Sequence, residues 1–298
     1  MKKSRKFFRE MDLFESILFF VVLVYTLSII FVLYLGMLNS LKTYDDSVYY
    51  GNFFGLPDSR YGWQFKYYTT ELFEKFRVQP LGQANYVYFF DMMFNSLYYS
   101  VFMTFFTIAT QIMVAYACAK FTFKLNKVLY ITAIVTMIVP IVGSLASEVQ
   151  IAESLGLRNS VIGVCIMRCR YSGLYFLVFY AMFKNISWTY AEAAQIDGAN
   201  NLRIFLQIML PLTLSTVSAV FVLQFISNWN DYYTPMIFVP QMPTIAYGLF
   251  EFNGYPEREA ATPLKLAASM ATCVPVVIVF IIFRNKIMGN VAIGGIKG

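Results

Sequence analysis

Charged and strongly polar side chains are rare inside the long apolar stretches of this chain, so those that occur there are the first candidates for chemistry. Arg168 and Arg170 lie in one such stretch. A second stretch contains the polar group Asn228, Trp229, Asn230 and Asp231. The chain has no histidine, which excludes catalysis by a Ser-His or Cys-His pair. Because one acid and two arginines are a poor set of convergent groups for a membrane enzyme, we predict that the chain is not an enzyme.

The cysteines indicate neither a disulfide framework nor a metal site. All four lie within apolar segments: Cys118, Cys165, Cys169 and Cys273. Cys165 and Cys169 are spaced to share one face of a helix. Since no histidine is available to complete a zinc site, we interpret them as two small packing residues. We expect this chain to bind no metal and no cofactor.

Composition indicates a protein embedded in lipid. The 298 residues are 58% apolar and 13% charged, whereas ordinary globular chains carry about 25% charged residues. The net charge of +6 does not indicate nucleic-acid binding, because the Lys and Arg residues lie at the ends of apolar runs rather than on one polar face.

Six apolar runs are long enough to cross a membrane as helices, since a span needs about 20 apolar residues. They cover residues 16–38, 92–119, 128–147, 162–183, 213–239 and 264–283. The first run exceeds the apolar core of a signal peptide, which has about 7 to 15 residues, so we expect a retained helix. The predicted fold class is an all-α integral membrane protein with six transmembrane helices.

Basic residues predict the orientation of these helices. They gather before the first run, directly after the second run and after the last run, and such segments tend to stay in the cytoplasm. Both termini are therefore predicted to be cytoplasmic, and the loop over residues 39–91 lies on the outer side. The aromatic residues of this loop suit packing at the membrane interface, and stacking on sugars or contact with a binding protein is the alternative.

A polar loop over residues 184–212 separates the fourth and fifth runs on the cytoplasmic side. Thr189 and Glu192 are spaced as a capping box, and Gly198 is suited to ending a short helix in a left-handed conformation. Ala194 and Gly198 leave one helix face almost without side chains, which permits close approach of another surface. An apolar stripe at helical spacing follows: Leu202, Phe205, Leu206, Met209 and Leu210. A capped surface helix without any partner is the simpler interpretation.

Residues 190–211 resemble the EAA loop of ABC-importer permease subunits, which has E-A-A, three residues, G, nine residues and I-x-L-P. The matching positions are Glu192, Ala193, Ala194, Gly198, Ile208, Leu210 and Pro211. The D-G-A at 197–199 is typical of the carbohydrate branch, whose type member is the inner maltose permease subunit. Further short matches occur at 95–97 (N-S-L), 156–160 (G-L-R-N-S), 229–231 (W-N-D) and 293–298 (I-G-G-I-K-G). The resemblance therefore extends over residues 90–298.

The resemblance implies a type I ABC importer permease fold and a role as the transmembrane subunit of a sugar or oligosaccharide importer. In that family the loop is a coupling helix, which contacts a cytoplasmic ATPase and transmits the motion of ATP binding to the spans. The residues to which this role carries over are Glu192, Ala193, Ala194, Asp197, Gly198, Ala199, Ile208, Leu210 and Pro211. The chain has no Walker motif, so ATP and Mg are expected on the partner ATPase.

The same resemblance implies an ATPase dimer, a second permease subunit and an extracytoplasmic solute-binding protein as partners, in the cell membrane of a prokaryote. We divide the chain into a tail with the first helix (1–38), an outer loop (39–91), a permease core (92–284) and a cytoplasmic tail (285–298). The alternatives are an importer of a non-sugar solute such as glycerol phosphate, and a membrane scaffold. Deleting residues 190–199 distinguishes the scaffold from a coupled permease, because only a scaffold would keep assembling with the ATPase.

Two polar groups depart from the family or have an open role. Arg168 and Arg170 stand where family members commonly carry a proline. Three interpretations are open for these arginines. Their side chains extend to the outer membrane surface, or they contribute to the pathway or to a partner contact, or the predicted span begins later in the chain than residue 162. The group from Asn228 to Asp231 faces either a cavity or the helices of the partner permease.

Overall fold

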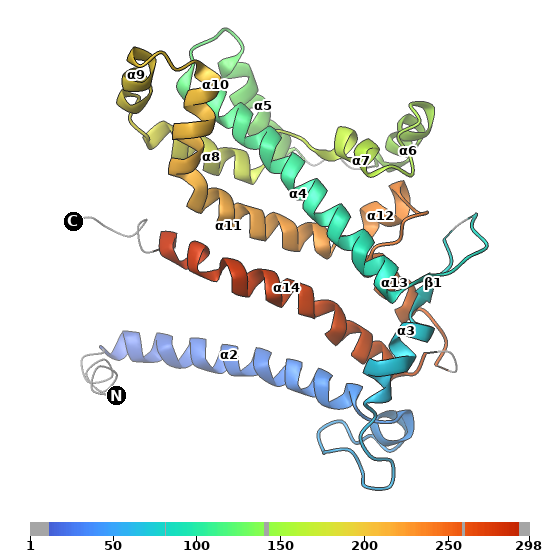
Figure 1. Ribbon diagram of the computed structural model, residues 1–298. Helices are drawn as coiled ribbons and strands as arrows, with labels where there is room; N and C mark the ends of the chain where they lie inside the picture. Colours follow the sequence, from blue (N-terminus) through green and yellow to red (C-terminus); the bar gives the residue numbers. More distant parts are fainter. Residues whose placement is uncertain (1–11, 81, 140–142, 258–259, 292–298) are drawn as a thin grey trace. The chain divides into compact units, whose positions relative to one another are not determined.

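The structure, a computed structural model, describes residues 12–80, 82–139, 143–257 and 260–291 (Figure 1). It divides into two units, which we describe separately. The first comprises Met1–Phe76 and Asn253–Ala271, and the second comprises Arg77–Phe252 and Thr272–Gly298. The predicted basic tail before residue 12 and the matched segment 293–298 lie outside the described residues.

The first unit is built on helix α2, Leu13–Ser40. Asp12 begins this helix with a capping box, because its carboxylate accepts from the helix backbone while Glu15 accepts from Asp12 N at 3.2 Å. Almost all side chains of α2 are exposed, which suits a helix surrounded by lipid. Short elements follow: the π-helical turns η1 (Asp45–Tyr49) and η2 (Tyr67–Glu71), and helix α3 (Leu72–Lys75).

A buried polar network organises the loop after α2. Lys42 is fully buried, and its ammonium donates to Asn39 Oδ1 (3.3 Å) and to the Asn52 carbonyl. Asp46 accepts from Asn52 Nδ2 and from the Asp58 backbone N–H, both at 2.9 Å. Burial lowers the pKa of Lys42, and the nearby Asp46 carboxylate opposes this effect. Hydrogen bonds between its own residues therefore hold the predicted outer loop in a defined conformation.

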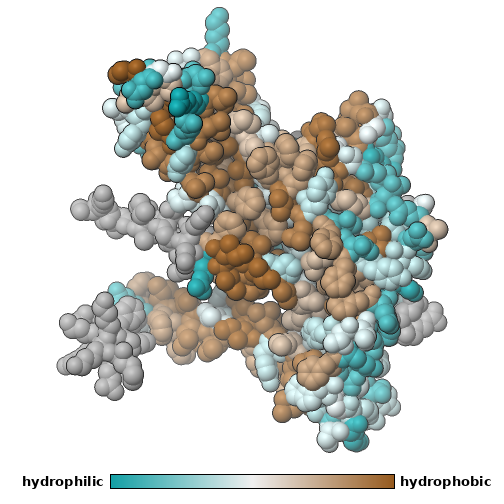
Figure 2. Space-filling model, in the orientation of Figure 1, coloured by the Kyte–Doolittle hydropathy of each residue, from teal (hydrophilic) through white to brown (hydrophobic). Residues whose placement is uncertain are grey.

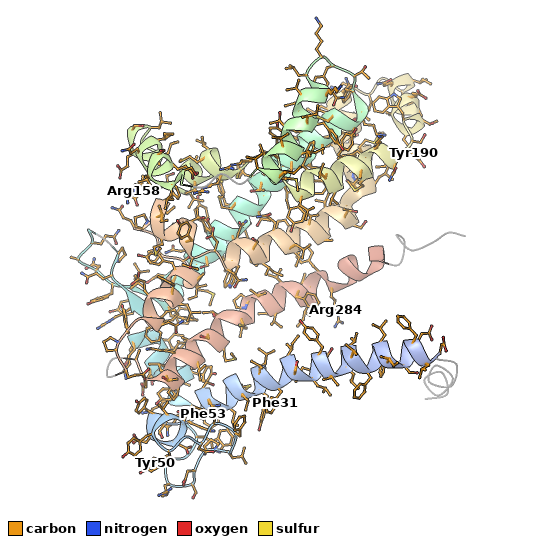
Figure 3. The ribbon with its side chains drawn as sticks, turned by 180° about the vertical axis from the view of Figure 1, so that it is seen from behind. Phe31, Tyr50, Phe53, Arg158, Tyr190 and Arg284 are labelled. Atoms are coloured by element: carbon orange, nitrogen blue, oxygen red, sulfur yellow. The ribbon has the colours of Figure 1, made fainter. Side chains whose placement is uncertain are left out.

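Aromatic residues of the same loop contact one another and α2. Phe31 of α2 stacks on Phe54 with ring centroids 6.5 Å apart, and Tyr49 meets Tyr50 edge to face at 5.0 Å. Figure 3 shows Phe31, Tyr50 and Phe53 near one end of α2. Tyr49, Tyr50 and Phe54 remain mostly exposed, so both predictions for these rings, interface packing and contact with a partner or sugar, stay predictions.

The core of the second unit lies where α4 (Phe89–Lys120) packs against α8 (Leu174–Asn185) and α11 (Leu210–Trp229). The other helical elements are α5 (Asn126–Ile138), α6 (Leu145–Ser154), α7 (Val161–Arg168), α9 (Thr189–Ile196), α10 (Asn201–Ile204), the π-helical turn η3 (Phe205–Met209) and α12 (Tyr233–Phe238). Two helices extend into both units, α13 (Ile245–Asn253) and α14 (Thr262–Val291). Strands β1 (Arg77–Val78) and β2 (Val87–Tyr88) pair antiparallel, with Val78 opposite Val87.

The predicted all-α membrane fold class is confirmed, although the described residues hold fewer long spans than predicted. Four helical segments are long and apolar enough to cross a membrane: Leu13–Ser40, Phe89–Lys120, Asn201–Trp229 and Thr262–Arg284. They correspond to the first, second, fifth and sixth predicted spans. The third predicted span corresponds to the shorter apolar helix α5. Helix α14 continues to Val291, whereas its span-like part ends at Arg284, so the division of the chain at residue 285 stays a prediction.

The prediction of one continuous helix over residues 162–183 is wrong. Helix α7 ends at Arg168, and α8 begins only at Leu174. Gly173 precedes α8 with φ +148°, a backbone conformation open to glycine and rarely to other residues. We call residues 169–173 the α7–α8 break.

The prediction of one continuous helix over residues 213–239 is also wrong. Helix α11 ends at Trp229, and α12 begins at Tyr233. Asp231 Oδ1 accepts from Thr234 N at 3.0 Å, and a carboxylate that accepts from the first turn stabilises the start of a new helix. The polar group at the end of α11 therefore turns the chain.

The matched G-L-R-N-S segment forms a tight connection into α7. Asn159 has φ +61°, and its backbone N–H donates to the Phe238 carbonyl at 2.7 Å. Ser160 caps α7 by accepting from Gly163 N at 3.4 Å. A Cβ at Gly163 would lie 2.0 Å from the Leu157 carbonyl oxygen, so only glycine fits this approach. The motif is thus explained by backbone geometry.

Apolar side chains cover the visible surfaces of the long helices (Figure 2). Phe105 of α4, Leu223 of α11 and Ile282 of α14 are all more than half exposed. A soluble protein rarely exposes large contiguous apolar patches, whereas lipid tails are as apolar as these side chains. The surface therefore fits a protein that crosses the membrane several times.

Candidate functional site

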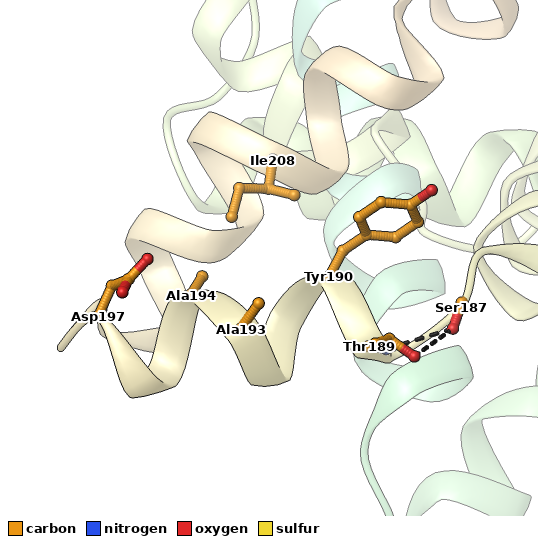
Figure 4. A pocket seen from close by; sticks show the side chains of 7 residues that line it. All are labelled: Ser187, Thr189, Tyr190, Ala193, Ala194, Asp197 and Ile208. Atoms are coloured by element: carbon orange, nitrogen blue, oxygen red, sulfur yellow. Dashed lines mark hydrogen bonds between the residues drawn. The ribbon is translucent and has the colours of Figure 1, made fainter.

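Helix α9 begins one residue earlier than predicted. The Trp188 carbonyl accepts from the N–H groups of Ala191 (2.8 Å) and Glu192 (3.1 Å), so Thr189 is already helical. The predicted capping box between Thr189 and Glu192 is therefore wrong. The Ser187 hydroxyl accepts from Thr189 N at 3.3 Å and shares a 2.8 Å hydrogen bond with the Thr189 hydroxyl (Figure 4).

Gly198 ends α9 in the left-handed conformation, as predicted, with φ +82°. Its N–H donates to the Gln195 carbonyl at 3.0 Å, and the Ala199 N–H donates to the Ala194 carbonyl at 2.9 Å. These two bonds form a Schellman motif, which satisfies the last carbonyls of the helix. The end of α9 is thus defined by hydrogen bonds that require a left-handed residue at position 198.

An open groove of about 550 Å³ lies along α9 and brings several predicted coupling residues together (Figure 4). It is lined by Ser187, Thr189, Tyr190, Ala193, Ala194, Asp197 and Ile208. Gly198 and Ala199 follow directly, and Leu210 and Pro211 begin α11. Glu192 is exposed but does not line the groove. The prediction missed Tyr190 and Ser187, which frame one end of this groove.

The opposite face of α9 is fixed in the core. Ala191 is fully buried, as are Ile204 of α10 and Met209 of η3. All three belong to the same apolar cluster as the facing sides of α4 and α8. Burial of apolar surface stabilises this contact at about 25 cal/mol per Å². The short helix is therefore attached to the membrane-spanning helices rather than carried on a free loop.

A cluster of aromatic rings, which we call the aromatic hub, lies beneath the loop. Tyr116 of α4 contacts Phe205 at 4.8 Å, Phe183 at 5.2 Å and Phe121 at 5.6 Å between ring centroids. Phe121 in turn contacts Trp188 at 5.8 Å. Offset and edge-to-face pairs of this kind contribute beyond their area burial. The hub connects the start of α9 and the turn before α11 to one position on α4.

The predicted apolar stripe after Gly198 is only partly correct. Phe205 and Met209 are buried, but Leu202 and Leu206 are at least half exposed. The π-helical turn η3 is the reason, because a wider turn changes the angle between successive side chains and rotates the stripe. Leu206 instead lines an apolar groove between α4 and α11.

Arg168 forms a partly buried ion pair. Its guanidinium lies 2.8 Å from Glu148 of α6 and 4.8 Å from the centroid of the Phe238 ring. Ser144 donates to the other Glu148 oxygen at 2.7 Å. Arg170 lies in the α7–α8 break and is exposed. The two arginines are therefore placed in different surroundings, and the sequence had not indicated Glu148 as a partner.

We expect the effects of substituting Arg168 and Glu148 on the free energy of unfolding to be coupled. Arg168→Met or Glu148→Gln alone leaves one charge unpaired at a partly buried site, which costs about 1–3 kcal/mol. The double variant is expected to lose less than the sum of the two single losses. Thermal unfolding of the purified transporter measures these differences. Additive losses would contradict the coupling.

The Arg158–Glu153 pair provides the control; Arg158 is labelled in Figure 3. The two arginines are similarly exposed, at 35% for Arg158 and 28% for Arg168, but Glu153 is 52% exposed against 23% for Glu148. More exposed pairs contribute only about 0–1 kcal/mol. Arg158→Met is therefore expected to change the unfolding temperature much less than Arg168→Met. Equal losses would assign the effect to lost arginine packing rather than to burial of the pair.

The structure separates the polar group at the end of α11. Asn228 Nδ2 donates to Thr104 Oγ1 at 3.0 Å, and Asp231 accepts from the Tyr99 hydroxyl at 3.3 Å, so both face α4. Trp229 is buried, and its indole N–H donates to the Thr272 carbonyl at 3.3 Å. Asn230 is exposed, and its amide donates to its own helix. Only part of the predicted set therefore shares a surface.

Sequence reasoning missed the polar face of α4 that receives Asn228. Its members are Ser96, Ser100, Thr104, Thr107 and Gln111. The signal was present, because these residues recur three or four positions apart in an otherwise apolar run, which is the spacing of one helix face. Among the described residues, no group of three His, Cys, Asp or Glu side chains is placed to hold a metal ion.

Comparisons with known proteins match most of this chain. The family model for the binding-protein-dependent transport system inner membrane component matches residues 111–292. The arabinooligosaccharides transport system permease protein AraQ of Bacillus subtilis is 26% identical over 217 residues, which cover 70% of this chain and 74% of that protein. The sn-glycerol-3-phosphate transport system permease protein UgpE of Salmonella typhi is 28% identical over 228 residues, covering 74% and 80%.

A solved structure has the same fold. It is a bacterial ABC transporter involved in the import of the acidic polysaccharide alginate, with a TM-score of 0.71, 22% identity and coverage of 91% of this chain and 95% of that chain. The family match includes the loop around α9 and more than half of the chain. The chain therefore belongs to the binding-protein-dependent transport system inner membrane components, as a multi-pass, non-enzymatic permease subunit of an ABC importer that works with an ATPase and a solute-binding protein.

Proposed function

We propose that this subunit forms half of the translocation pathway for a sugar or oligosaccharide and couples it to ATP hydrolysis through α9. The observation that carries the coupling is the two-sided environment of this helix. Ala191 is fully buried in the core, while Ala193 and Asp197 lie in an open groove. A short helix that is fixed on one side and open on the other transmits force as a rigid body.

The residues of the coupling contact are those of the matched loop, with α9 as the surface that an ATPase subunit covers. Glu192, Ala193, Ala194, Asp197, Gly198 and Ala199 belong to that surface, and Ile208, Leu210 and Pro211 carry the motion into α11. Ile196 is 86% exposed at the end of α9. An apolar side chain in this position supports the presence of a covering partner, with ATP and Mg bound by that partner and no cofactor by this chain.

The further partners are a second, different permease subunit and an extracytoplasmic solute-binding protein. A pathway for a sugar must be enclosed by helices on all sides. Because the six predicted spans of one chain supply only part of that enclosure, a second permease subunit is needed. We place both termini in the cytoplasm of a prokaryotic cell, because α9 must face the ATPase and the basic residues flanking the spans agree with that orientation.

A phosphorylated solute is the second candidate, supported by the similarity to UgpE. Phosphate binding favours basic side chains that donate several charged hydrogen bonds. Arg168 is already paired with Glu148 at 2.8 Å. The groups that face α4 from α11 and the residues after it are the Asn228 amide and the Asp231 carboxylate, and neither is basic. This chemistry favours an uncharged, hydroxyl-rich solute over glycerol phosphate.

Uptake by the complete transporter in proteoliposomes tests the proposal. The complex of both permeases, the ATPase and the binding protein is expected to accumulate labelled arabinooligosaccharides when ATP is supplied on the ATPase side. It is expected to leave sn-glycerol-3-phosphate outside. Selective uptake of glycerol phosphate would favour the second candidate. Failure to transport glycerol phosphate and every member of a panel of labelled sugars and oligosaccharides would contradict both candidates.

A further inference from the structure

Helix α4 carries a polar stripe through the middle of the membrane-spanning unit. The stripe consists of Ser96, Ser100, Thr104, Thr107 and Gln111. At 3.6 residues per turn these positions fall within an arc of about 80° on the helix. Ser96, Ser100, Thr104 and Gln111 are each at most 5% exposed. The adjacent residues Val101 and Phe105 are exposed and apolar, so α4 has a buried polar face and an outer apolar face.

Ser96, at the start of the stripe, accepts from the Ile245 backbone N–H of α13. Two other polar surfaces close over the rest of the stripe. From α11, Asn228 Nδ2 donates to Thr104 Oγ1 at 3.0 Å, and Gln224 Nε2 donates to Asn228 Oδ1 at 3.2 Å. From the α7–α8 break, Cys169 Sγ lies 3.5 Å from Thr107 Oγ1. These contacts define a seam between α4, α11 and the break.

The break places non-helical backbone against the middle of a long span. A Cβ built at Gly173 would lie 3.2 Å from Gln111 Nε2, so the backbone there approaches the amide directly. Non-helical backbone at membrane depth occurs only where it is buried in protein or lines a water-filled path, because lipid offers no hydrogen bonds. The seam is therefore the place where such backbone is protected.

Some polar atoms of the seam are enclosed without a protein partner. Ser100 Oγ and Gln111 Oε1 have no hydrogen bond among the described residues, although both are shielded from solvent. An enclosed, unpaired polar atom is unfavourable, and an apolar residue of similar size would avoid the loss. A static helix contact does not explain why these positions are polar. A surface that opens to water and solute in another conformation does.

We infer that this seam is the surface on which the subunit binds a hydroxyl-rich solute during passage, and that it is closed in the conformation described here. The inference rests on the proposed function and names the residues that serve it. Hydroxyl and amide groups donate and accept, as sugar hydroxyls do, so the opened seam offers neutral hydrogen bonds without holding a charged group. Asn228 belongs to this surface, whereas Trp229 and Asn230 do not.

Cysteine labelling of the complete transporter tests the inference. Ser100→Cys and Thr104→Cys are compared with Val101→Cys and Phe105→Cys, each one residue further along the helix, in a chain whose four native cysteines are alanine. The probe is the charged reagent trimethylammonium-ethyl methanethiosulfonate. It is applied at rest, with binding protein and ATP, and after trapping with vanadate. Uptake is measured for every variant.

The stripe positions are expected to react at least about tenfold faster in one state of the cycle than at rest, because a buried thiol gains water and forms thiolate. The adjacent positions should stay slow in every state, since they face lipid or a partner. Slow labelling of positions 100 and 104 in all states would overturn the inference and leave a fixed hydrogen-bonded contact. Equal labelling of both faces would overturn it as well.

Uptake kinetics supply a second measurement in case a cysteine variant fails to assemble. Thr104→Val is expected to raise the KM for oligosaccharide uptake about threefold or more, as the loss of one neutral hydrogen bond does. Thr104→Ser keeps the hydroxyl and should restore the KM. An unchanged KM in Thr104→Val contradicts a solute contact. If the complex transports oligosaccharide while positions 100 and 104 stay unlabelled in every state, this inference alone is wrong. If the complex hydrolyses ATP but takes up neither oligosaccharide nor glycerol phosphate, the proposed function is wrong.

Discussion

Gly198→Val is expected to lower uptake at least about tenfold while the ATPase still hydrolyses ATP, since a β-branched residue is strained at positive φ by more than 1–2 kcal/mol. The wild-type φ is +82°. A Cβ at this position meets nothing within 4 Å, so the effect comes from the backbone rather than from a clash. To relieve the strain, the Schellman bonds to Gln195 and Ala194 must break, and the end of α9 changes shape.

Uptake and ATP hydrolysis must be measured on the same proteoliposomes to show that the Gly198→Val variant loses uptake but keeps ATP hydrolysis. Gly198→Asn is the matched control, because asparagine is tolerated in the left-handed conformation at a helix end. It should retain most of the uptake although its side chain is about as large as valine. If valine and asparagine reduce uptake equally, bulk on the contact surface is responsible. Normal uptake by Gly198→Val would count against α9 as the coupling element.

Tyr116→Ala is expected to destabilise the loop and uncouple the transporter, because it removes the ring at the centre of the aromatic hub. Truncation of a buried aromatic residue costs about 3–5 kcal/mol when the cavity cannot collapse. Tyr116 contacts Phe121, Phe183 and Phe205, which belong to different elements. Its loss therefore loosens α9 and the start of α11 from α4 together. Thermal unfolding of the purified transporter and the ratio of uptake to ATP hydrolysis measure the two effects.

Tyr116→Phe separates the ring from its hydroxyl. The Tyr116 hydroxyl oxygen is enclosed and has no hydrogen-bond partner among the described residues. Removing an unpaired buried hydroxyl is expected to be neutral or to stabilise by about 1 kcal/mol. A Tyr116→Phe variant as damaged as Tyr116→Ala would show that the hydroxyl, rather than ring packing, holds the loop in place.

Local patterns were sufficient for the class of the protein and for the position of α9. Span detection depends on the hydropathy of about 20 consecutive residues, which no tertiary contact changes. Gly198 could be identified for a similar reason, since left-handed backbone strongly favours glycine wherever it occurs. The coupling residues around it were located by resemblance and remain a proposal, although the groove along α9 brings Ala193, Ala194, Asp197 and Ile208 together.

Local sequence patterns did not predict where the helices are interrupted. The runs over 162–183 and 213–239 have the composition of single spans, but both are interrupted in the structure. The first break depends on the backbone of Gly173, and the second on the carboxylate of Asp231 at the start of α12. Hydropathy averages hide such interruptions, because one glycine or one acid changes the mean of a window very little.

The pairings inside the membrane-spanning unit lie beyond any sequence window. Thr104 and Asn228 form a hydrogen bond although they lie 124 residues apart in the chain, and Tyr99 and Asp231 do so across 132 residues. Composition and spacing place Tyr99, Thr104 and Asn228 on helix faces, because helical periodicity is a local property. Which faces meet, whether Arg168 finds Glu148 and whether Ser100 is left unpaired depend on how α4, α6, α7 and α11 pack. That packing is decided by the summed contacts of many side chains, and a single sequence does not reveal the sum.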